Sequence, residues 1–583
     1  MLQQLFHIIV LSIICIIWGI PVLLIFFSST KKDVFWYHST TGLLSFLFIC
    51  GCLLISILSS LIYLLVPLKF AYLAFFTIAL SVYLLLIHKK NIISLFAETH
   101  QRGIVGSIMP LMFVIVSIFL FVLLSSLPPA NGDTQIYHLQ IIRWQSEYKV
   151  VPGTANLYPR LGLGSNWFNL ISFFYWPAFK NENFTYLNAS FVIWFFTWLI
   201  SKWHFYFQKQ DKNPNTSFLS FFYFLLLLYC MFDWQLYRDS ANSTNYDFAV
   251  NAFTIIISSF FIEGVFINKP RNHFSFIIWL FALCAISFKL SGIFLLFLIF
   301  YHMLISWKTV RWPIVIFSGI VVLLPVLIKN YLTSGYPLFP STIAINSPDW
   351  ILPKKLASGF YRYIILSNRF YNYQWSFVNK FETTSFNWIP YWFSGILWKH
   401  RIILALALSS IFFLFKRTSL QIDHKQLRSI IISLLLMLAG WFFTAPDPGR
   451  FGYGILLSTS FLAVSLFVSR FMKVKFYMLA FLITTIIVIV YTIKKSKPII
   501  NNLYYTIHPI PSKEPPYQIT RVNTIDLKLP YRINTNWDCR CYFLPLPCIT
   551  QKNPFLQVRG ENLKDGFRMN PQPDSSYISN YIY

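Results

Sequence analysis

The sequence has very few charged residues. Only 11% of its 583 residues are Asp, Glu, Lys or Arg, whereas a soluble domain averages roughly 25%. Hydrophobic residues make up 56% of the chain and aromatic residues 20%. This balance excludes an ordinary soluble domain. It predicts a polytopic membrane protein, with Phe in contact with lipid and Trp at the membrane interfaces.

Acidic residues are the scarcer charged type, with 20 Asp and Glu against 47 Lys and Arg. The resulting net charge of +27 would suggest a nucleic-acid ligand in a soluble protein. Here the basic residues lie mainly in short loops between apolar segments, so we expect them to orient the spans through the positive-inside rule. No basic domain with interleaved aromatics stands apart from those segments, and nucleic acid is not expected as a partner.

Several motifs of well-known enzyme classes are absent. The chain has no Gly-rich phosphate loop that ends in Lys-Ser/Thr, no His-Glu-x-x-His motif and no Gly-x-Ser-x-Gly turn. These absences argue against P-loop nucleotide hydrolysis, zinc proteolysis of the common kind and serine hydrolysis.

Cysteine is scarce as well, with eight in the chain. Five lie in apolar segments and are expected to be inert packing residues. The other three, Cys539, Cys541 and Cys548, lie in the polar tail. Their spacing is compatible with one disulfide and a spare thiol on an oxidising side, and it lacks the paired Cys-x-x-Cys of a typical zinc site.

Long apolar segments, in contrast, are abundant. A helix needs roughly 20 apolar residues to cross a bilayer, and about fourteen segments qualify as candidates. The predicted fold class is therefore an all-α polytopic membrane protein, with amphipathic helices in its first large external loop. The expected parts are N-terminal transmembrane helices over 1–104, a transmembrane core over 105–493 and an extracytoplasmic tail over 494–583.

Basic residues set the expected sides of the membrane. The clusters expected in the cytoplasm include Lys31 and Lys32, Lys89 and Lys90, Lys202 with Lys209 and Lys212, Lys308 and Arg311, and Lys416 and Arg417. The opposite side then receives segments 127–183, 233–247, 329–400 and 445–453. Lys494, Lys495 and Lys497 conflict with this order, but the alternation of spans and the tail cysteines favour an external tail.

An acid follows one apolar segment directly, in "LPPANGDTQIYHLQIIRW" at 127–144. If a helix begins after Asp133, then Asp133, Tyr137, Gln140 and Trp144 share one of its faces. A carboxylate next to apolar surface can serve as a general base or bind a divalent metal. Asp is also a favoured helix N-cap, and the pattern alone leaves both roles open.

Basic and polar residues of the external segments are candidates for substrate binding, because a guanidinium can bind two phosphate oxygens at once. The candidates are Arg143, Arg160, Lys329 and Arg450, together with His138 and Tyr336. Each has a structural alternative. The arginines could snorkel or form ion pairs, Lys329 could anchor a span at the interface, and His138 could simply be hydrogen-bonded.

Two charged residues belong to the apolar segments themselves. Asp247 begins a predicted span, where a carboxylate is costly and is therefore a functional candidate, with helix capping as the alternative. Lys289, in "SFKLSG", lies between two short apolar runs. It is either the tip of a hairpin or a charge inside the membrane.

The order of these motifs resembles the GT-C superfamily of membrane glycosyltransferases. The matching stretches are "NGDTQIYHLQIIRW", "KNYLTSGYPLFPS" and "APDPGRF", each next to an apolar segment. Over most of 105–583 the chain also resembles a family of uncharacterised bacterial multi-pass membrane proteins with a GT-C-like core. The stretches that carry this second resemblance include "VPG", "RLG" and "NPFLQVRG".

The resemblance implies inverting transfer of a sugar from a polyprenyl-phosphate donor to a glycan or lipid acceptor. The expected location is the bacterial inner (cytoplasmic) membrane, with the active site facing the periplasm or exterior. Asp133 would act on the acceptor hydroxyl, and Arg160, Lys329 and Arg450 would neutralise the departing phosphate. A divalent metal stays an open question. The alternatives are a transporter or flippase, a polymerase or ligase of lipid-linked oligosaccharide, and a non-catalytic scaffold.

Overall fold

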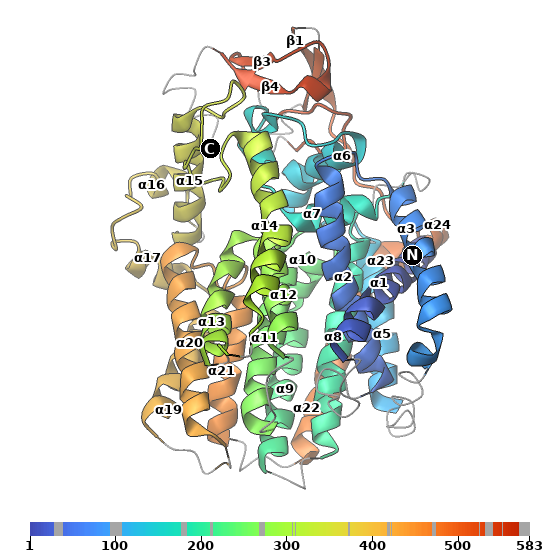
Figure 1. The fold of residues 1–583 in the computed structure, drawn as a ribbon, viewed down its shortest axis with the longest axis vertical. Coiled ribbons are helices and arrows are strands. Elements are labelled where there is room, and N and C mark those ends of the chain that lie inside the picture. Colours follow the sequence, from blue (N-terminus) through green and yellow to red (C-terminus); the bar gives the residue numbers. More distant parts are fainter. Residues whose placement is uncertain are drawn as a thin grey trace.

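The computed structural model shows a mostly helical protein whose long helices run side by side in one bundle (Figure 1). It describes residues 1–570 with gaps at 28–38, 94–107, 177–183, 210–213, 268–273, 306, 309, 371–372, 417–419, 421, 469–473, 524, 531–539 and 551. The long helices are α1 (Leu2–Phe27), α2 (Thr40–Tyr63), α3 (Phe70–Ile87), α5 (Ile108–Ser125), α8 (Tyr186–Phe207), α9 (Pro214–Phe232), α11 (Asp247–Ile267), α12 (Phe274–Phe288), α13 (Leu296–Ile305), α14 (Trp312–Ser334), α18 (Trp398–Leu408), α20 (His424–Thr444), α21 (Tyr453–Val468) and α22 (Val474–Lys495).

Eight helical stretches among the described residues are long and apolar enough to cross a membrane. They are α1, α2, α3, α9, α11, α14, α20 and the stretch formed by α18, the 3-10 turn η6 (Ser409–Ile411) and α19 (Phe412–Phe415). Shorter apolar helices lie in α5, α12, α21 and the stretch of η5 (Leu290–Leu295) with α13. The structure thus agrees with the predicted helical, multi-pass membrane character.

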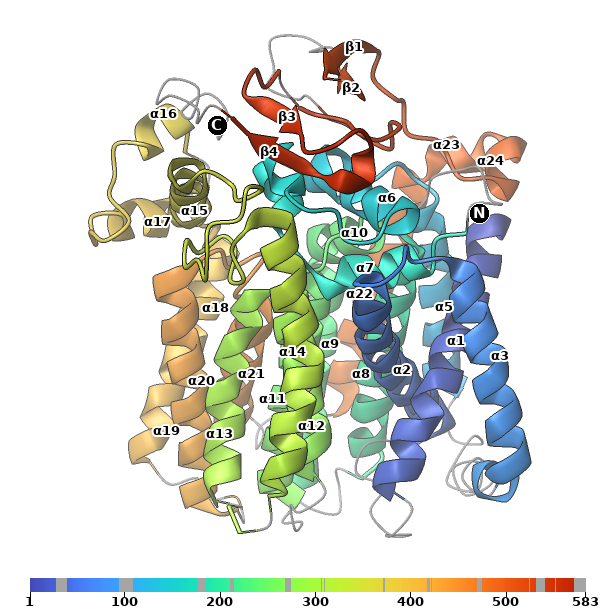
Figure 2. The ribbon, with the colours of Figure 1, turned by 45° about the horizontal axis from the view of Figure 1, so that its top comes forward.

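Short elements gather towards one end of the bundle, in the upper half of Figure 2. They are η1 (Thr134–His138), α6 (Leu139–Glu147), η2 (Thr154–Asn156), η3 (Pro159–Gly162), α7 (Asn166–Phe173), α10 (Trp234–Ala241), α15 (Lys354–Arg369), α16 (Trp375–Val378), α17 (Ile389–Gly395), α23 (Lys497–Ile500) and α24 (Leu503–Ile507). The segments that the charge pattern assigned to one side therefore share one end of the molecule. The helices α6 and α7 are almost wholly buried, so they do not lie open at an interface as predicted.

Small residues bring the first two helices into close contact. A Cβ at Gly19 would lie 2.0 Å from the backbone oxygen of Leu47, and one at Gly51 would lie 1.7 Å from that of Cys15. Neither position can accept a larger side chain without separating α1 from α2. Close backbone approach through small residues is a common way for apolar helices to associate in a membrane.

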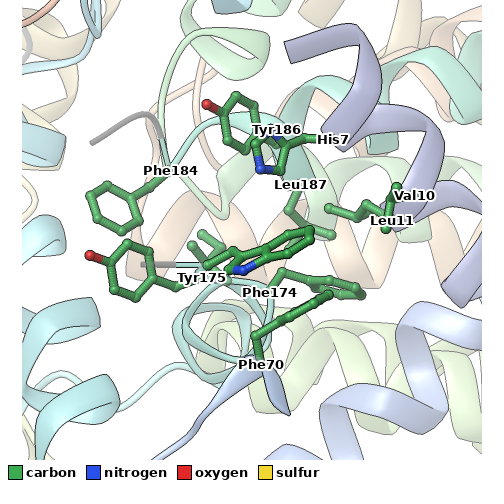
Figure 3. A pocket seen from close by; sticks show the side chains of 11 residues that line it. His7, Val10, Leu11, Phe70, Phe174, Tyr175, Phe184, Tyr186 and Leu187 are labelled. Carbon is green, nitrogen blue, oxygen red and sulfur yellow. The ribbon is translucent and has the colours of Figure 1, made fainter. Parts of the chain in front are cut away.

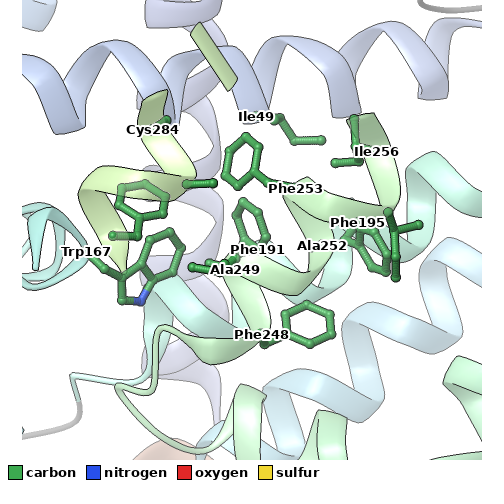
Figure 4. Packing of buried hydrophobic residues seen from close by; sticks show 14 of the residues in the cluster. Ile49, Trp167, Phe191, Phe195, Phe248, Ala249, Ala252, Phe253, Ile256 and Cys284 are labelled. Atoms are coloured by element: carbon green, nitrogen blue, oxygen red, sulfur yellow. The ribbon is translucent and has the colours of Figure 1, made fainter. Parts of the chain in front are cut away.

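The centre of the bundle is packed with aromatic rings (Figure 4). Trp167 of α7 meets Phe191 of α8 edge to face, with ring centroids 5.3 Å apart, and Phe191 in turn contacts Phe253 of α11. Trp167, Phe191 and Phe253 are all buried. This packing fixes α7 on the long helices α8 and α11.

The tail folds back over the short elements (Figure 2). It contains two antiparallel pairs of strands, β1 (Tyr517–Val522) with β2 (Ile525–Pro530), and β3 (Leu556–Val558) with β4 (Phe567–Met569). A disulfide joins Cys541 to Cys548, which confirms the disulfide predicted among the tail cysteines. Cys539 lies outside the described residues.

Candidate functional site

Asp133 lies where the chain leaves α5 and turns into the π-helical turn η1. The side-chain oxygen of Asn131 accepts the Asp133 backbone N–H at 2.8 Å, so Asn131 caps this turn. The Asp133 side chain makes no capping hydrogen bond. The capping interpretation therefore fails for Asp133, and its carboxylate is available for other partners.

Five charged side chains form a continuous series of ion pairs around Asp133. Its Oδ1 accepts from Arg160 at 3.1 Å, and its Oδ2 accepts from Arg450 at 3.1 Å. The Nε of Arg450 donates to Oδ2 of Asp247 at 2.9 Å, and the Nζ of Lys289 donates to Oδ1 of Asp247 at 2.6 Å. We call these five residues the charged row. It contains three cations and two carboxylates.

The charged row is only partly buried. Asp247 is 3% exposed, whereas the side chains of Asp133 and Arg160 are 20% and 19% exposed. Arg450 is the most accessible of the five, at 43%. The row therefore begins in the helical interior and reaches the surface at Asp133 and Arg450, where a ligand can approach it.

The loop before α21 holds Arg450 in place. The Oδ1 atom of Asp447 accepts the backbone N–H groups of Gly449 and Arg450, at 2.9 and 3.1 Å. Asn251 of α11 donates to the backbone oxygen of Arg450 at 2.5 Å. Side chains that bind the backbone of this loop thus fix it, and the Arg450 side chain is left to bind carboxylates.

Aromatic rings surround the guanidinium of Arg160. It lies 5.5 Å from the ring centroid of Tyr137, 5.9 Å from that of Tyr158 and 5.6 Å from that of Tyr363. It also donates to the Tyr363 hydroxyl at 3.3 Å. Tyr363 belongs to α15, so segment 329–400 reaches the charged row through this contact.

The arginines keep Asp133 ionised. Burial alone would raise the pKa of Asp133, but the charges of Arg450 and Arg160 outweigh it and hold the pKa below its usual value. Burial would lower the pKa of the Arg160 guanidinium, but the neighbouring tyrosines and Asp133 raise it above its usual value. Asp133 is thus a carboxylate, with both oxygens bound to cations.

His138 lies behind Asp133 and is neutral. Its Nδ1 is 3.0 Å from the Thr244 hydroxyl, and its ring packs against Phe168 at 4.7 Å. Burial lowers the pKa of His138 to about 3, despite the opposing attraction of Asp133. The Nε2 atom is buried and has no hydrogen-bond partner. An uncharged imidazole of this kind can exchange a proton only if that nitrogen gains a partner.

Besides His138, three predicted site residues lie outside the charged row. Lys329 is buried in α14, where its Nζ donates to the side-chain oxygens of Asn166 and Asn169 at 3.3 and 3.1 Å. Arg143 pairs with Glu147 and is bound to the tail. Tyr336 donates to the backbone oxygen of Leu352 and packs in a small cluster of its own. The structure gives each of the three a packing role.

Sequence reasoning missed two supports of the site and left a third undecided. Asn251 and Asp447 orient Arg450. Asn251 carries no charge or motif, and Asp447 was part of "APDPGRF" without a role of its own. Lys289 was left between two interpretations, and the structure places it between α12 and η5, paired with Asp247.

The donor chemistry of the site does not match a divalent metal. Among the described residues, no group of three or more His, Cys, Asp or Glu side chains could hold a metal ion. Both carboxylates of the charged row already bind cations, and three basic side chains lie within hydrogen-bond distance of them. The observed arrangement instead suits an anion at the exposed end of the row.

A separate small cavity lies on the flank of the bundle, with a volume of about 40 Å³ (Figure 3). It lies among α1, the start of α3, α7 and α8, and its walls are mostly apolar and aromatic. His7 stacks on Tyr186 at 4.6 Å in this cavity, and Trp176 stacks on Phe70 at 4.9 Å. No member of the charged row lines it.

Comparison with known proteins places the chain in one family. A family model described as a domain of unknown function (DUF8201) matches residues 1–457. The chain belongs to this family. The match includes every residue of the charged row, and residues 458–583 lie beyond it. No curated protein and no solved structure matches the chain.

Proposed function

We propose that this protein is an integral membrane glycosyltransferase of the GT-C type. It transfers a sugar from a polyprenyl-phosphate donor to a glycan or lipid acceptor. One observation carries the proposal: an ionised Asp133, clamped between Arg160 and Arg450, lies at the end of an apolar helical bundle. A lipid-linked donor would bring its phosphate to this end and keep its chain in the bilayer.

The charges of the row fit such a donor. Within these five residues, three cations and two carboxylates leave one positive charge in excess. Asp447 lies beside Arg450, and burial raises the pKa of its carboxyl group, which favours the neutral form. A sugar linked to a polyprenyl phosphate is a phosphodiester with a single negative charge, so its binding would balance the row. Arg450 is the most exposed cation and would contact this phosphate first, with Arg160 on the other side of Asp133.

The proposed reaction is a single displacement at the anomeric carbon. The acceptor hydroxyl attacks this carbon, and the bond from the carbon to the phosphate oxygen breaks with its electron pair on that oxygen. Asp133 takes the proton of the hydroxyl. Arg160 and Arg450 stabilise the phosphate monoester that leaves, as fixed cations do for developing negative charge.

Competition for the guanidinium groups would activate the base. In the ligand-free row, two arginines lower the proton affinity of Asp133. When a phosphate binds Arg450, this arginine stabilises the Asp133 carboxylate less, and the pKa of Asp133 rises towards the range of a useful base. Donor binding would thus prepare Asp133 for proton transfer.

The proposal includes about fourteen membrane spans and an active site that faces the periplasm or exterior of a bacterial inner membrane. The tail disulfide supports this orientation, because the segment between Cys541 and Cys548 binds the backbone of Gln135, two residues after Asp133. Disulfides persist on the oxidising side of a membrane and are rare in the cytosol.

The donor class can be tested directly with purified protein in liposomes. We expect a radiolabelled sugar to move from a polyprenyl-phosphate donor to a lipid or glycan acceptor, and no transfer from a nucleotide sugar. Movement of an intact lipid-linked oligosaccharide between leaflets, without cleavage of the sugar–phosphate bond, would instead indicate a flippase. Growth of the glycan chain by several repeats would indicate a polymerase.

A further inference from the structure

A disulfide-closed ring in the tail binds the helix that follows Asp133. The ring consists of residues 541–548 and is closed by Cys541 and Cys548, and we call it the tail ring. It lies about 400 residues along the chain from the helix that it contacts. Chain connectivity does not bring such distant segments together, so the interactions between them must hold the ring in place.

The tail ring holds this helix at four points. The backbone N–H of Tyr542 donates to the backbone oxygen of Gln135 at 2.8 Å. Gln140 donates its amide to the backbone oxygens of Tyr542 and Leu544, at 3.1 and 3.0 Å. Arg143 donates to the backbone oxygen of Phe543 at 2.5 Å. Its guanidinium lies 4.6 Å from the Phe543 ring centroid.

The first of these contacts falls within the π-helical turn η1. A π-turn is rare, and it leaves backbone groups without the partners that an α-helix would give them. Gln135 lies two residues after Asp133, and its backbone oxygen is the acceptor for Tyr542. The tail ring therefore supplies a backbone donor to the irregular turn that sets the direction of Asp133.

The tail ring is itself anchored to the bundle. The Phe543 ring lies 4.6 Å from that of Phe184 and 5.8 Å from that of Tyr175. Phe184 and Tyr175 also line the flank cavity shown in Figure 3. Phe543 thus fills a space between α6 and the wall of this cavity, and it fixes the position of the carbonyl that binds Arg143.

We propose that the tail ring is a positioning element of the Asp133 site, and that opening it misplaces Asp133 without unfolding the bundle. Its positioning residues are Tyr542, through its backbone N–H, and Phe543. This inference rests on the proposed function for its consequence on catalysis, but its structural part does not. The ring lies beyond the residues that the DUF8201 model matches.

A reporter thiol next to Asp133 tests the structural part. A Cβ at Gly132 has nothing within 4 Å, so Gly132→Cys leaves the segment undisturbed. Cys539→Ser forms the background, to remove the remaining tail thiol. In this background, Cys541→Ser with Cys548→Ser opens the ring, and Phe543→Ala removes the anchor while the ring stays closed. The rate at which a membrane-impermeant maleimide labels the reporter thiol is measured for each protein in liposomes.

We expect ring opening and Phe543→Ala each to raise the labelling rate about tenfold, since a lost hydrogen bond to a charged group shifts local opening by at least that factor. Arg559→Ala is the matched control. It removes the pair between Arg559 and Asp349, 2.8 Å apart, which anchors the tail away from the ring. Its labelling rate should equal that of the reporter protein with an intact tail. Equal labelling of all four proteins would overturn the inference.

A transfer assay on the same proteins without the reporter tests the consequence for catalysis. We expect ring opening to lower kcat about tenfold and to change KM less than twofold. A misplaced base stabilises the transition state less, whereas donor binding does not depend on it. A merely stabilising ring would lower the melting temperature and leave the kcat of folded protein unchanged, which contradicts the inference. If labelling rises but the reporter-free protein with an intact tail transfers no sugar, the proposed function fails and the positioning role stands.

Discussion

The helix α11 carries a carboxylate near each of its ends, and the two have opposite surroundings. Asp247, at its start, belongs to the charged row. Glu263 lies about 24 Å further along the helix and accepts from Lys202 of α8 at 3.0 Å and from Tyr223 of α9 at 2.7 Å. We call Lys202 and Glu263 the closed pair. Its side chains are 2% and 0% exposed.

The closed pair and the charged row differ in their charge balance and in their exposure. The closed pair has one cation for one carboxylate, and the bundle encloses both. The charged row has an excess cation, and its last members reach the surface. A balanced, enclosed pair can join helices but cannot bind a ligand without opening the bundle. A row with an excess charge at the surface has a place for an anion.

The closed pair should therefore matter for stability alone. Lys202→Met leaves Glu263 charged and uncompensated, and we expect it to lower the free energy of unfolding by about 3–5 kcal/mol. Adding Glu263→Gln should restore most of this loss, because no buried charge then remains and the amide oxygen still accepts from Tyr223. Unfolding by SDS titration in mixed micelles measures both effects. If the double variant is as unstable as the single one, the pair has another role.

Sugar transfer per folded molecule is the control for this comparison. It should be the same in the double variant and the wild type. A large fall in transfer would link the closed pair to the reaction and remove the contrast between the two regions.

The charged row, in contrast, should matter for activity. Arg450→Lys keeps the positive charge but cannot bind Asp133 and Asp247 at once as the guanidinium does. We expect transfer to fall about 100-fold, the usual effect of losing one well-placed donor to developing negative charge. The control is Arg559→Lys, which changes a tail arginine that pairs with Asp349. It should leave transfer unchanged. If Arg450→Lys transfers sugar at the normal rate, simultaneous binding of Arg450 to Asp133 and Asp247 is not needed for the reaction.

The pH dependence of stability gives a smaller test of the same contrast. The folded pKa of His138 is about 3 because of burial, and the unfolded value is near 6.5. The unfolded chain thus binds the extra proton between these values, and stability falls as the pH falls from 6.5 towards 3. Asp133 contributes with its pKa below the usual value, so its share is lost only at lower pH. We expect melting temperatures between pH 7 and 4.5 to fall less steeply in His138→Gln. Parallel curves would show that folding does not shift the pKa of His138.

Much of the site could be predicted from the sequence because it is built from charged residues, which are rare in this chain. Asp133, Arg160 and Arg450 stand out as charges next to apolar segments, and alternation of spans places them at one end. The pairing of Asp247 with Lys289 could not be predicted, since it depends on how α11 packs beside the break between α12 and η5. Lys202 was expected in a cytoplasmic cluster of basic residues and is instead enclosed with Glu263, because α8 continues past it to Phe207.

The role of the tail could be predicted least. Cysteine spacing suggested a disulfide, and one is present. Nothing in the composition of 541–548 indicated that its backbone groups would bind Gln135 and Gln140. Hydrogen bonds from backbone groups leave no residue pattern, so sequence reasoning has little to detect. The same limit applies to Asn251, which binds the backbone of Arg450.

The central claim is that Asp133 is the base of a sugar transfer from a lipid phosphate. The most direct test compares wild-type protein with Asp133→Asn in liposomes that contain a radiolabelled polyprenyl-phosphate sugar and an acceptor. Our account predicts that the wild type transfers the label and that Asp133→Asn, inserted and folded to the same extent, is at least about 100-fold slower. Equal transfer by the two proteins would contradict it.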